Sequence, residues 1–225
     1  MSIFSALDVA APVVLTVPGL GDSGPSHWQT LWEEARPDTR RVELGMWHSP
    51  HRNAWVTKLD QAIRQARTPV ILVAHSLGVL ATIWWAELAR QPFGLPVAGA
   101  LLVAPADVDR TAAPASLAAF RPTPLTALPF PSIVVASHDD PWIDIQRARD
   151  LANAWGSHFV DAGHQGHLNA DSGLGWWPEG QKLLDRLLDT ASDRHGRPRT
   201  PREARALLAV NATDAAQAHY LGAVS

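Results

Sequence analysis

The chain has 225 residues, of which 46% are apolar and 18% charged, and its formal net charge is −3 at pH 7. This length and composition predict one folded domain with a full-sized core, and they exclude a disordered chain and a membrane protein. The small net charge provides no basic field for nucleic acid, and the absence of cysteine excludes disulfides, thiolate metal sites and a cysteine nucleophile.

The first predicted strand covers residues 12–17 and ends in a loop with three glycines between Pro18 and Pro25. This loop lacks the Lys-Ser/Thr ending of a P-loop and the spacing of a dinucleotide-binding fingerprint, so no phosphate site is predicted. A helical pattern follows through Ala35, and Ser26 is its expected N-cap residue.

A second strand is predicted at 39–44 and an amphipathic helix at 53–66. Between them, His48 and His51 have the side chains of metal ligands, but no carboxylate stands at ligand spacing nearby. A loop over the sheet edge is therefore the favoured interpretation, and no metal site is predicted.

The most informative stretch joins an apolar run beginning at Thr68 to a long apolar helix through the turn Ala74-His75-Ser76-Leu77-Gly78. A buried strand that breaks sharply into a helix around a serine is typical of a nucleophile elbow. Such a turn requires small residues two positions before and after the serine, where Ala74 and Gly78 stand. An ordinary serine N-cap is the alternative, but the position between strand and helix favours an exposed nucleophile, with His75 pointing away from its hydroxyl.

Strands and helices continue to alternate after this turn. Helical patterns at 79–90, 143–155 and 181–191 are interspersed with strands at 96–103, 132–136 and 157–162. This alternation predicts a parallel sheet of about six strands with helices on both faces. Residues 105–131 contain six prolines and little periodicity, so we expect a minimal lid and an open site.

The composition changes near the C-terminus. Residues 1–190 are predicted to form a single domain, and residues 191–225 a C-terminal extension that is partly helical or flexible. Five arginines and two prolines between Asp193 and Arg205 precede a short helical pattern around 204–209. A solvated tail with a docking helix is the favoured interpretation, and a contact with an acidic partner or a subunit is the alternative.

Candidate catalytic residues follow three of the predicted strands. Ser76 comes first, Asp139 and Asp140 follow the strand at 132–136, and His164 and His167 follow the strand at 157–162. The order serine, aspartate, histidine is that of α/β-hydrolases, and it predicts that fold and a catalytic triad. The residues alone leave open which aspartate and which histidine belong to the triad.

Several motifs resemble the retinoblastoma-binding-protein-9-like family of small serine hydrolases, over about residues 12–190. The resemblance implies that Asp140, directly before proline, is the triad acid and that His167 of the Gly-His-x-Asn element is the base. It also implies a compact α/β-hydrolase with little or no lid, in a family whose members are mostly described, in loose terms, as esterases, amidases or peptidases. The motifs are Pro18-Gly19-x-Gly21, Ser26-His27-Trp28, Ala74-His75-Ser76-Leu77-Gly78, Asp139-Asp140-Pro141-Trp142, Gly166-His167-Leu168-Asn169 and Ser172-Gly173-x-Gly175-x-Trp177-Pro178-x-Gly180.

The predicted function is hydrolysis of a small ester or amide through an acyl-enzyme on Ser76, without cofactor. Backbone N–H groups of Leu20 and Leu77 are the expected oxyanion donors. The chain has ten tryptophans; Trp28, Trp142 and Trp176 fall on loops near the site and either line a substrate pocket or pack beneath the loops.

Other functions remain as alternatives at this stage. A catalytically weak hydrolase fold that serves as a binding module is one, and an acyl or peroxide-using transferase is another. The N-terminus lacks the basic start of a signal peptide, so a cytoplasmic location is expected, with no membrane or nucleic-acid partner. A homodimer or protein partner is compatible with the sequence but not indicated by it.

Overall fold

The computed structural model describes residues 11–192, 198 and 200–209 and contains one six-stranded, fully parallel sheet. Its strand order is β2-β1-β3-β4-β5-β6. Such a sheet confirms the predicted fold class. The strands are β1 (Val13–Val17), β2 (Thr39–Arg41), β3 (Val70–His75), β4 (Val97–Val103), β5 (Ser132–Ala136) and β6 (His158–Asp161).

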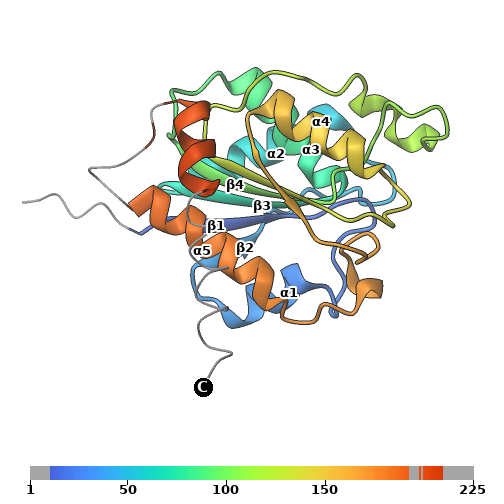
Figure 1. Ribbon diagram of the computed structural model, residues 1–225, viewed down its shortest axis with the longest axis horizontal. Helices are drawn as coiled ribbons and strands as arrows, with labels where there is room; N and C mark the ends of the chain where they lie inside the picture. The colour runs from blue at the N-terminus through green and yellow to red at the C-terminus, as the bar shows by residue number, and fades with distance from the viewer. Residues whose placement is uncertain (1–10, 193–197, 199, 210–225) are drawn as a thin grey trace, which may run out of the picture.

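Helices cover both faces of the sheet (Figure 1). On one face lie α2 (Arg52–Gln65), α3 (Leu77–Ala89) and α4 (Ile145–Trp155), and on the other lie α1 (Trp28–Ala35) and α5 (Pro178–Ser192). Two apolar clusters fill the layers between helices and sheet. Short 3₁₀ turns occur at η1 (Ala115–Phe120) and η2 (Ala170–Ser172).

The central elements follow directly from their apolar patterns. Every residue of β3 and β4 is buried, as expected for parallel strands covered on both faces. Helix α3 is apolar nearly all round, with a buried set that extends from Leu77 to Ala86, because it lies between the sheet and its neighbouring helices. The flanking α4 and α5 keep a polar face toward solvent.

Element boundaries differ from the sequence-based expectations at a few places. β2 ends at Arg41 rather than Leu44, because Val42 and Leu44 continue into the core without pairing as a strand. Helix α1 begins at Trp28, and its N-cap residue is His27, not Ser26. The side chain of His27 accepts the hydrogen bond that a serine would have accepted, so Ser26 lies outside the helix.

Part of the C-terminal extension packs against the domain. Residues 201–209 are helical, and Ala204 and Leu208 on this helix are buried. Arg205 donates a hydrogen bond of 2.9 Å to the side-chain oxygen of Asn153 on α4. Residues 210–225 lie outside the described part of the chain. No helix in the described part is both long and apolar enough to cross a membrane.

Candidate active site

Ser76 stands at a sharp turn between β3 and α3. Its backbone has φ 55° and ψ −120°, a conformation that residues other than glycine rarely adopt. Two residues later, a Cβ added at Gly78 would lie 2.2 Å from the carbonyl oxygen of Val17. The start of α3 thus approaches the end of β1 so closely that only glycine fits, and the strained turn lifts the serine hydroxyl out of the sheet.

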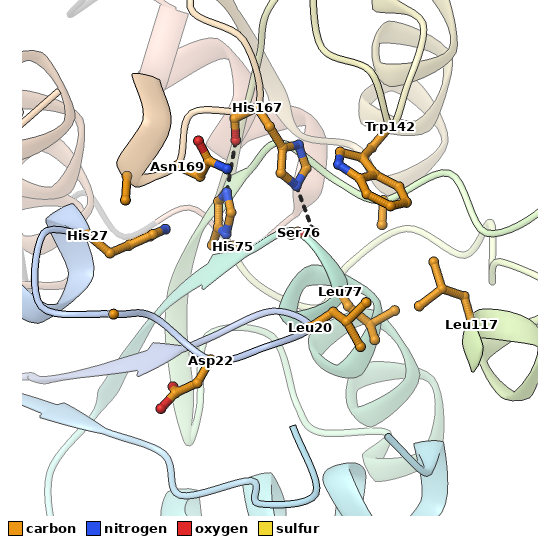
Figure 2. A pocket seen from close by; sticks show the side chains of 13 residues that line it. Leu20, Asp22, His27, His75, Ser76, Leu77, Leu117, Trp142, His167 and Asn169 are labelled. Carbon is orange, nitrogen blue, oxygen red and sulfur yellow. Dashed lines mark hydrogen bonds between the residues drawn. The ribbon is translucent and has the colours of Figure 1, made fainter. Parts of the chain in front are cut away.

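The structure brings Ser76, His167 and Asp140 together from three different loops. The Nε2 atom of His167 lies 2.8 Å from the Ser76 hydroxyl oxygen (Figure 2). Its Nδ1 atom lies 2.9 Å from each carboxylate oxygen of Asp140. The three groups form a continuous hydrogen-bonded chain at the carboxyl edge of the sheet.

The direction of each hydrogen bond in this chain follows from the carboxylate. An ionised carboxylate only accepts, so the His167 proton must lie on Nδ1 and point at Asp140. In the neutral ring Nε2 then carries a lone pair, and the Ser76 hydroxyl donates to it. The Asp140 side chain is fully buried and also accepts from the backbone N–H of Trp142 at 2.8 Å, which fixes its orientation.

The loop that carries His167 is held from below by two buried side chains. Nε2 of His75 donates to the carbonyl oxygen of His167 at 2.9 Å, and the indole N–H of Trp28 donates to that of Leu168 at 2.8 Å. Burial is the largest cause that lowers the pKa of His75 well below its usual value. His75 is therefore a neutral donor, and its ring lies away from the serine hydroxyl, toward the histidine loop.

Asp139 contacts the same loop but not the histidine ring. Its carboxylate accepts from the Ser137 hydroxyl at 2.6 Å and from the backbone N–H of Gly166 at 2.8 Å. The hydroxyl of Ser137 is the strongest cause that lowers the pKa of Asp139. The two adjacent aspartates thus contact different parts of one loop: Asp139 its backbone and Asp140 its ring.

A cavity of about 270 Å³ opens above the Ser76 hydroxyl. Leu20 and Leu77 both line it. A Cβ added at Gly19 would lie 2.8 Å from Cβ of Ser76, so the loop after β1 runs in contact with the elbow and brings Leu20 beside it. Leu77 is the first residue of α3, and the N–H groups of a first helical turn have no acceptor within the helix.

A family model described as serine hydrolase matches residues 14–186. The chain belongs to the serine hydrolase family. The match begins at the second residue of β1, covers the other five strands in full and includes the elbow, Asp140 and His167. No curated protein sequence matches this serine hydrolase.

Several solved structures resemble this serine hydrolase over most of its length. A protein from Pectobacterium atrosepticum described as a YdeN-like hydrolase is 33% identical, with a TM-score of 0.71 over 80% of this chain and 92% of its own. The ydeN gene product of Bacillus subtilis is 20% identical, with a TM-score of 0.64 over 79% and 99%. The mouse alpha/beta hydrolase domain-containing protein 10 is 16% identical, with a TM-score of 0.60 over 83% and 93%. The last two show the shared fold alone.

The structure separates the three tryptophans predicted near the pocket. Trp142 lines the cavity, with its ring centroid 6.0 Å from that of His167. Trp28 is buried against Trp32 and Trp177 instead, because its indole N–H reaches the histidine loop from the core side. Trp176 is 41% exposed and does not line the cavity. Trp28 therefore packs beneath the histidine loop, one of the two roles expected for it, whereas Trp176 belongs neither to the buried core nor to the lining of this cavity.

The other histidine of the loop lies apart from the serine. His164 is exposed, and its ring stacks on that of His138 with centroids 5.3 Å apart. Within the described residues, no three histidine, aspartate or glutamate side chains gather as metal ligands would.

The sequence reasoning missed the contacts by which Trp28 and Asp139 anchor the histidine loop. Nothing in their local sequence indicates a partner on another loop.

Proposed function

We propose that this serine hydrolase cleaves small esters or amides through an acyl-enzyme on Ser76. The observation that carries the proposal is the hydrogen-bonded chain from the Ser76 hydroxyl through His167 to Asp140, at 2.8 and 2.9 Å. A serine hydroxyl becomes nucleophilic when a neighbouring base takes its proton as it attacks. His167 is in place to do so, and Asp140 holds its ring in the tautomer that can.

The proposed reaction has two halves. In the first, Ser76 attacks the carbonyl carbon, and His167 passes the serine's proton to the departing alcohol or amine. In the second, water attacks the acyl-enzyme, His167 takes a proton from the water, and the serine hydroxyl is restored. Backbone N–H groups of Leu20 and Leu77 would bind the carbonyl oxygen as it becomes negative, an effect worth about 3 kcal/mol for each donor.

The substrate is proposed to be small and of the carboxylesterase or amidase type. A cavity of about 270 Å³ is slightly smaller than the sites of about 300–1,000 Å³ that usually hold small molecules. Within its family, the motifs around the elbow, Asp140 and His167 favour a position among retinoblastoma-binding-protein-9-like hydrolases. The alternative is a binding module that keeps the fold without turnover.

Labelling with a fluorophosphonate distinguishes these functions. We expect the folded protein to gain one phosphonyl adduct by intact mass, with the adduct on the peptide that contains Ser76, because only an activated serine attacks the probe at a useful rate. A panel of short-chain esters and amides then ranks the two substrate types. A folded protein that stays unlabelled at high probe concentration would support the binding module.

Asp140→Asn is expected to lower kcat by about 10⁴-fold, because an amide can donate to Nδ1 and thereby favour the wrong tautomer of His167. The matched change Asp139→Asn keeps an oxygen that can accept from Ser137 and Gly166, and we expect it to cost less than about tenfold. Initial rates on one ester measure both. A larger loss for Asp139→Asn would assign the triad acid to Asp139.

A further inference from the structure

Two buried histidines connect the start of α1 to the loop that carries His167, and neither has a role in the proposed proton transfers. His27 is 4% exposed and His75 is 5% exposed. Their ring centroids lie 4.8 Å apart, with an angle of 66° between the ring planes (Figure 2). Since His75 also donates to the carbonyl oxygen of His167 at 2.9 Å, the two rings link α1 to the proposed base.

The contacts of His27 fix the position of its proton. Its Nδ1 atom accepts a hydrogen bond of 3.2 Å from the backbone N–H of Gln29, as the N-cap of α1. Burial is the largest cause that lowers the pKa of His27 to about 4, and the positive charge of Arg41 contributes. The ring is therefore neutral near pH 7, and because Nδ1 accepts, its single proton lies on Nε2.

The Nε2–H group of His27 is buried and has no hydrogen-bond partner in the described part of the chain. A molecule in the cavity cannot contact this nitrogen, because the atom has almost no accessible surface. Buried donors are rarely left without an acceptor, and in Figure 2 the nitrogen-bearing tip of His27 is directed at the ring of His75. Any effect of this N–H on catalysis must therefore pass through His75.

His75 has one nitrogen that is free to accept. The ring is neutral, because burial is the largest cause that lowers its pKa well below the usual value. Its Nε2 atom donates to the carbonyl oxygen of His167, so its Nδ1 atom carries the lone pair. The two neighbouring rings thus have one unused group each, a donor on His27 and an acceptor on His75.

The N–H of His27 favours this state of His75 electrostatically. A lone pair on Nδ1 of His75 attracts the positive end of the N–H group, whereas a proton on Nδ1 would be repelled by it, and water screens such effects little in a buried site. In the other tautomer of His75, the lone pair of Nε2 would face the carbonyl oxygen of His167. That tautomer loses the hydrogen bond that holds the histidine loop.

We propose that His27 is a positioning residue for His167: its Nε2–H holds His75 in the tautomer that donates to the His167 backbone. The distance of 2.8 Å between Nε2 of His167 and the Ser76 hydroxyl oxygen depends on where this loop lies, and a misplacement of about 1 Å can cost about 100-fold in rate. This inference rests on the proposed function. It adds a residue at the start of α1 on which the proton transfers depend, although this residue contacts neither the substrate nor the serine–histidine–aspartate chain.

Two variants separate the two nitrogen atoms of His27. In His27→Asn the side-chain oxygen replaces Nδ1 as the N-cap acceptor, but the side chain is too short to reach His75. In His27→Gln the amide nitrogen takes the place of Nε2 as a donor, and the cap is lost. The first variant therefore keeps the helix cap and removes the contact with His75, and the second does the opposite.

Turnover and melting temperature should respond differently in these two variants. We expect His27→Asn to lower kcat on a short-chain ester on the order of tenfold, as for the loss of one hydrogen bond, with KM within about twofold because no substrate contact is lost. His27→Gln should keep kcat within about threefold of the wild type but melt at a lower temperature, because the cap is gone. If His27 is only a helix cap, His27→Gln will be the slower variant as well as the less stable one, and the inference is overturned.

The route through His75 has tests of its own. In His75→Gln the amide can donate to the carbonyl oxygen of His167 and has no tautomer to be fixed, so adding His27→Asn to this variant should change kcat by no more than about twofold. A further loss on the order of tenfold would mean that His27 acts by another route, and it would overturn the inference. Nitrogen NMR of the wild-type histidine side chains needs no His27 variant: the signals lost in His75→Gln identify His75, and a proton on its Nδ1 atom rather than on Nε2 would also overturn the inference.

Labelling of the wild type by the fluorophosphonate separates failure of this inference from failure of the proposed function. An unlabelled protein overturns the proposed function and this inference with it. A labelled protein in which His27→Asn keeps the wild-type kcat overturns this inference alone.

Discussion

Ser76→Ala is expected to abolish ester hydrolysis, with a loss in kcat on the order of 10⁶-fold. The variant removes the one hydroxyl within hydrogen-bond distance of His167 Nε2 in the described structure, and alanine has no atom that could form an acyl-enzyme. The fluorophosphonate adduct should be lost as well. Initial rates on a short-chain ester and intact mass after labelling measure the two effects.

The same variant should keep its fold. The Ser76 side chain makes no capping hydrogen bond to α3, and alanine meets the same backbone strain at φ 55° as serine does. Thermal melting and circular dichroism should therefore match the wild type closely. Ser49→Ala is a suitable control, because Ser49 is exposed and a surface change of this kind alters rates by no more than about twofold. Near-normal turnover in Ser76→Ala would assign the nucleophile to another residue.

The elbow and the sheet could be predicted because their signals are local. A buried strand needs an unbroken apolar run, and the approach of α3 to β1 needs a residue without a side chain at Gly78, where a Cβ would lie 2.2 Å from a carbonyl oxygen. Parallel strands bring their carboxyl ends to one edge, so the order of serine, aspartate and histidine along the chain predicts their meeting. The first two constraints lie in short stretches of sequence, and the third needs only the order of the motifs along the chain.

The same reasoning could not decide which of two neighbouring aspartates, or which of two neighbouring histidines, belongs to the triad. Asp139 and Asp140 are adjacent on one loop, and which of them faces His167 depends on contacts with a loop that follows another strand. In the structure Gly166 and Ser137 bind Asp139, and this leaves Asp140 facing the ring. The resemblance to known hydrolases pointed to Asp140, the residue that contacts the ring in the structure, where local chemistry left both aspartates open.

The roles of His27 and Trp28 were harder still to predict. Serine is preferred over histidine at an N-cap, so residue type favours Ser26. The cap at His27 also places a ring at the cavity, and a sequence pattern does not show which residues will line a cavity. Trp28 follows it into the core, where its indole N–H meets Leu168, 140 positions away. Both residues act through partners distant in the sequence, which propensity and periodicity do not describe.

His167→Ala is expected to lower kcat about as far as the loss of the nucleophile does, on the order of 10⁶-fold, because the two groups act as one unit. Without the imidazole the Ser76 hydroxyl keeps its proton, and the described residues offer no second side chain hydrogen-bonded to Ser76 that could protonate the leaving alcohol or amine. Rates on the same ester measure the loss, and fluorophosphonate labelling should fall with it because both reactions need the activated serine.

His164→Ala is the matched control on the same loop. His164 is exposed and stacks on His138 rather than on any residue of the serine–histidine–aspartate chain, so its removal should change rates by no more than about twofold. The opposite ranking would assign the base to His164. That result would require the loop to rearrange, because the His167 ring is fixed by Asp140 on one nitrogen and its backbone by His75. Equal and severe losses from both variants would instead indicate that the loop folds only with both rings in place, and melting temperatures would separate that case from catalysis.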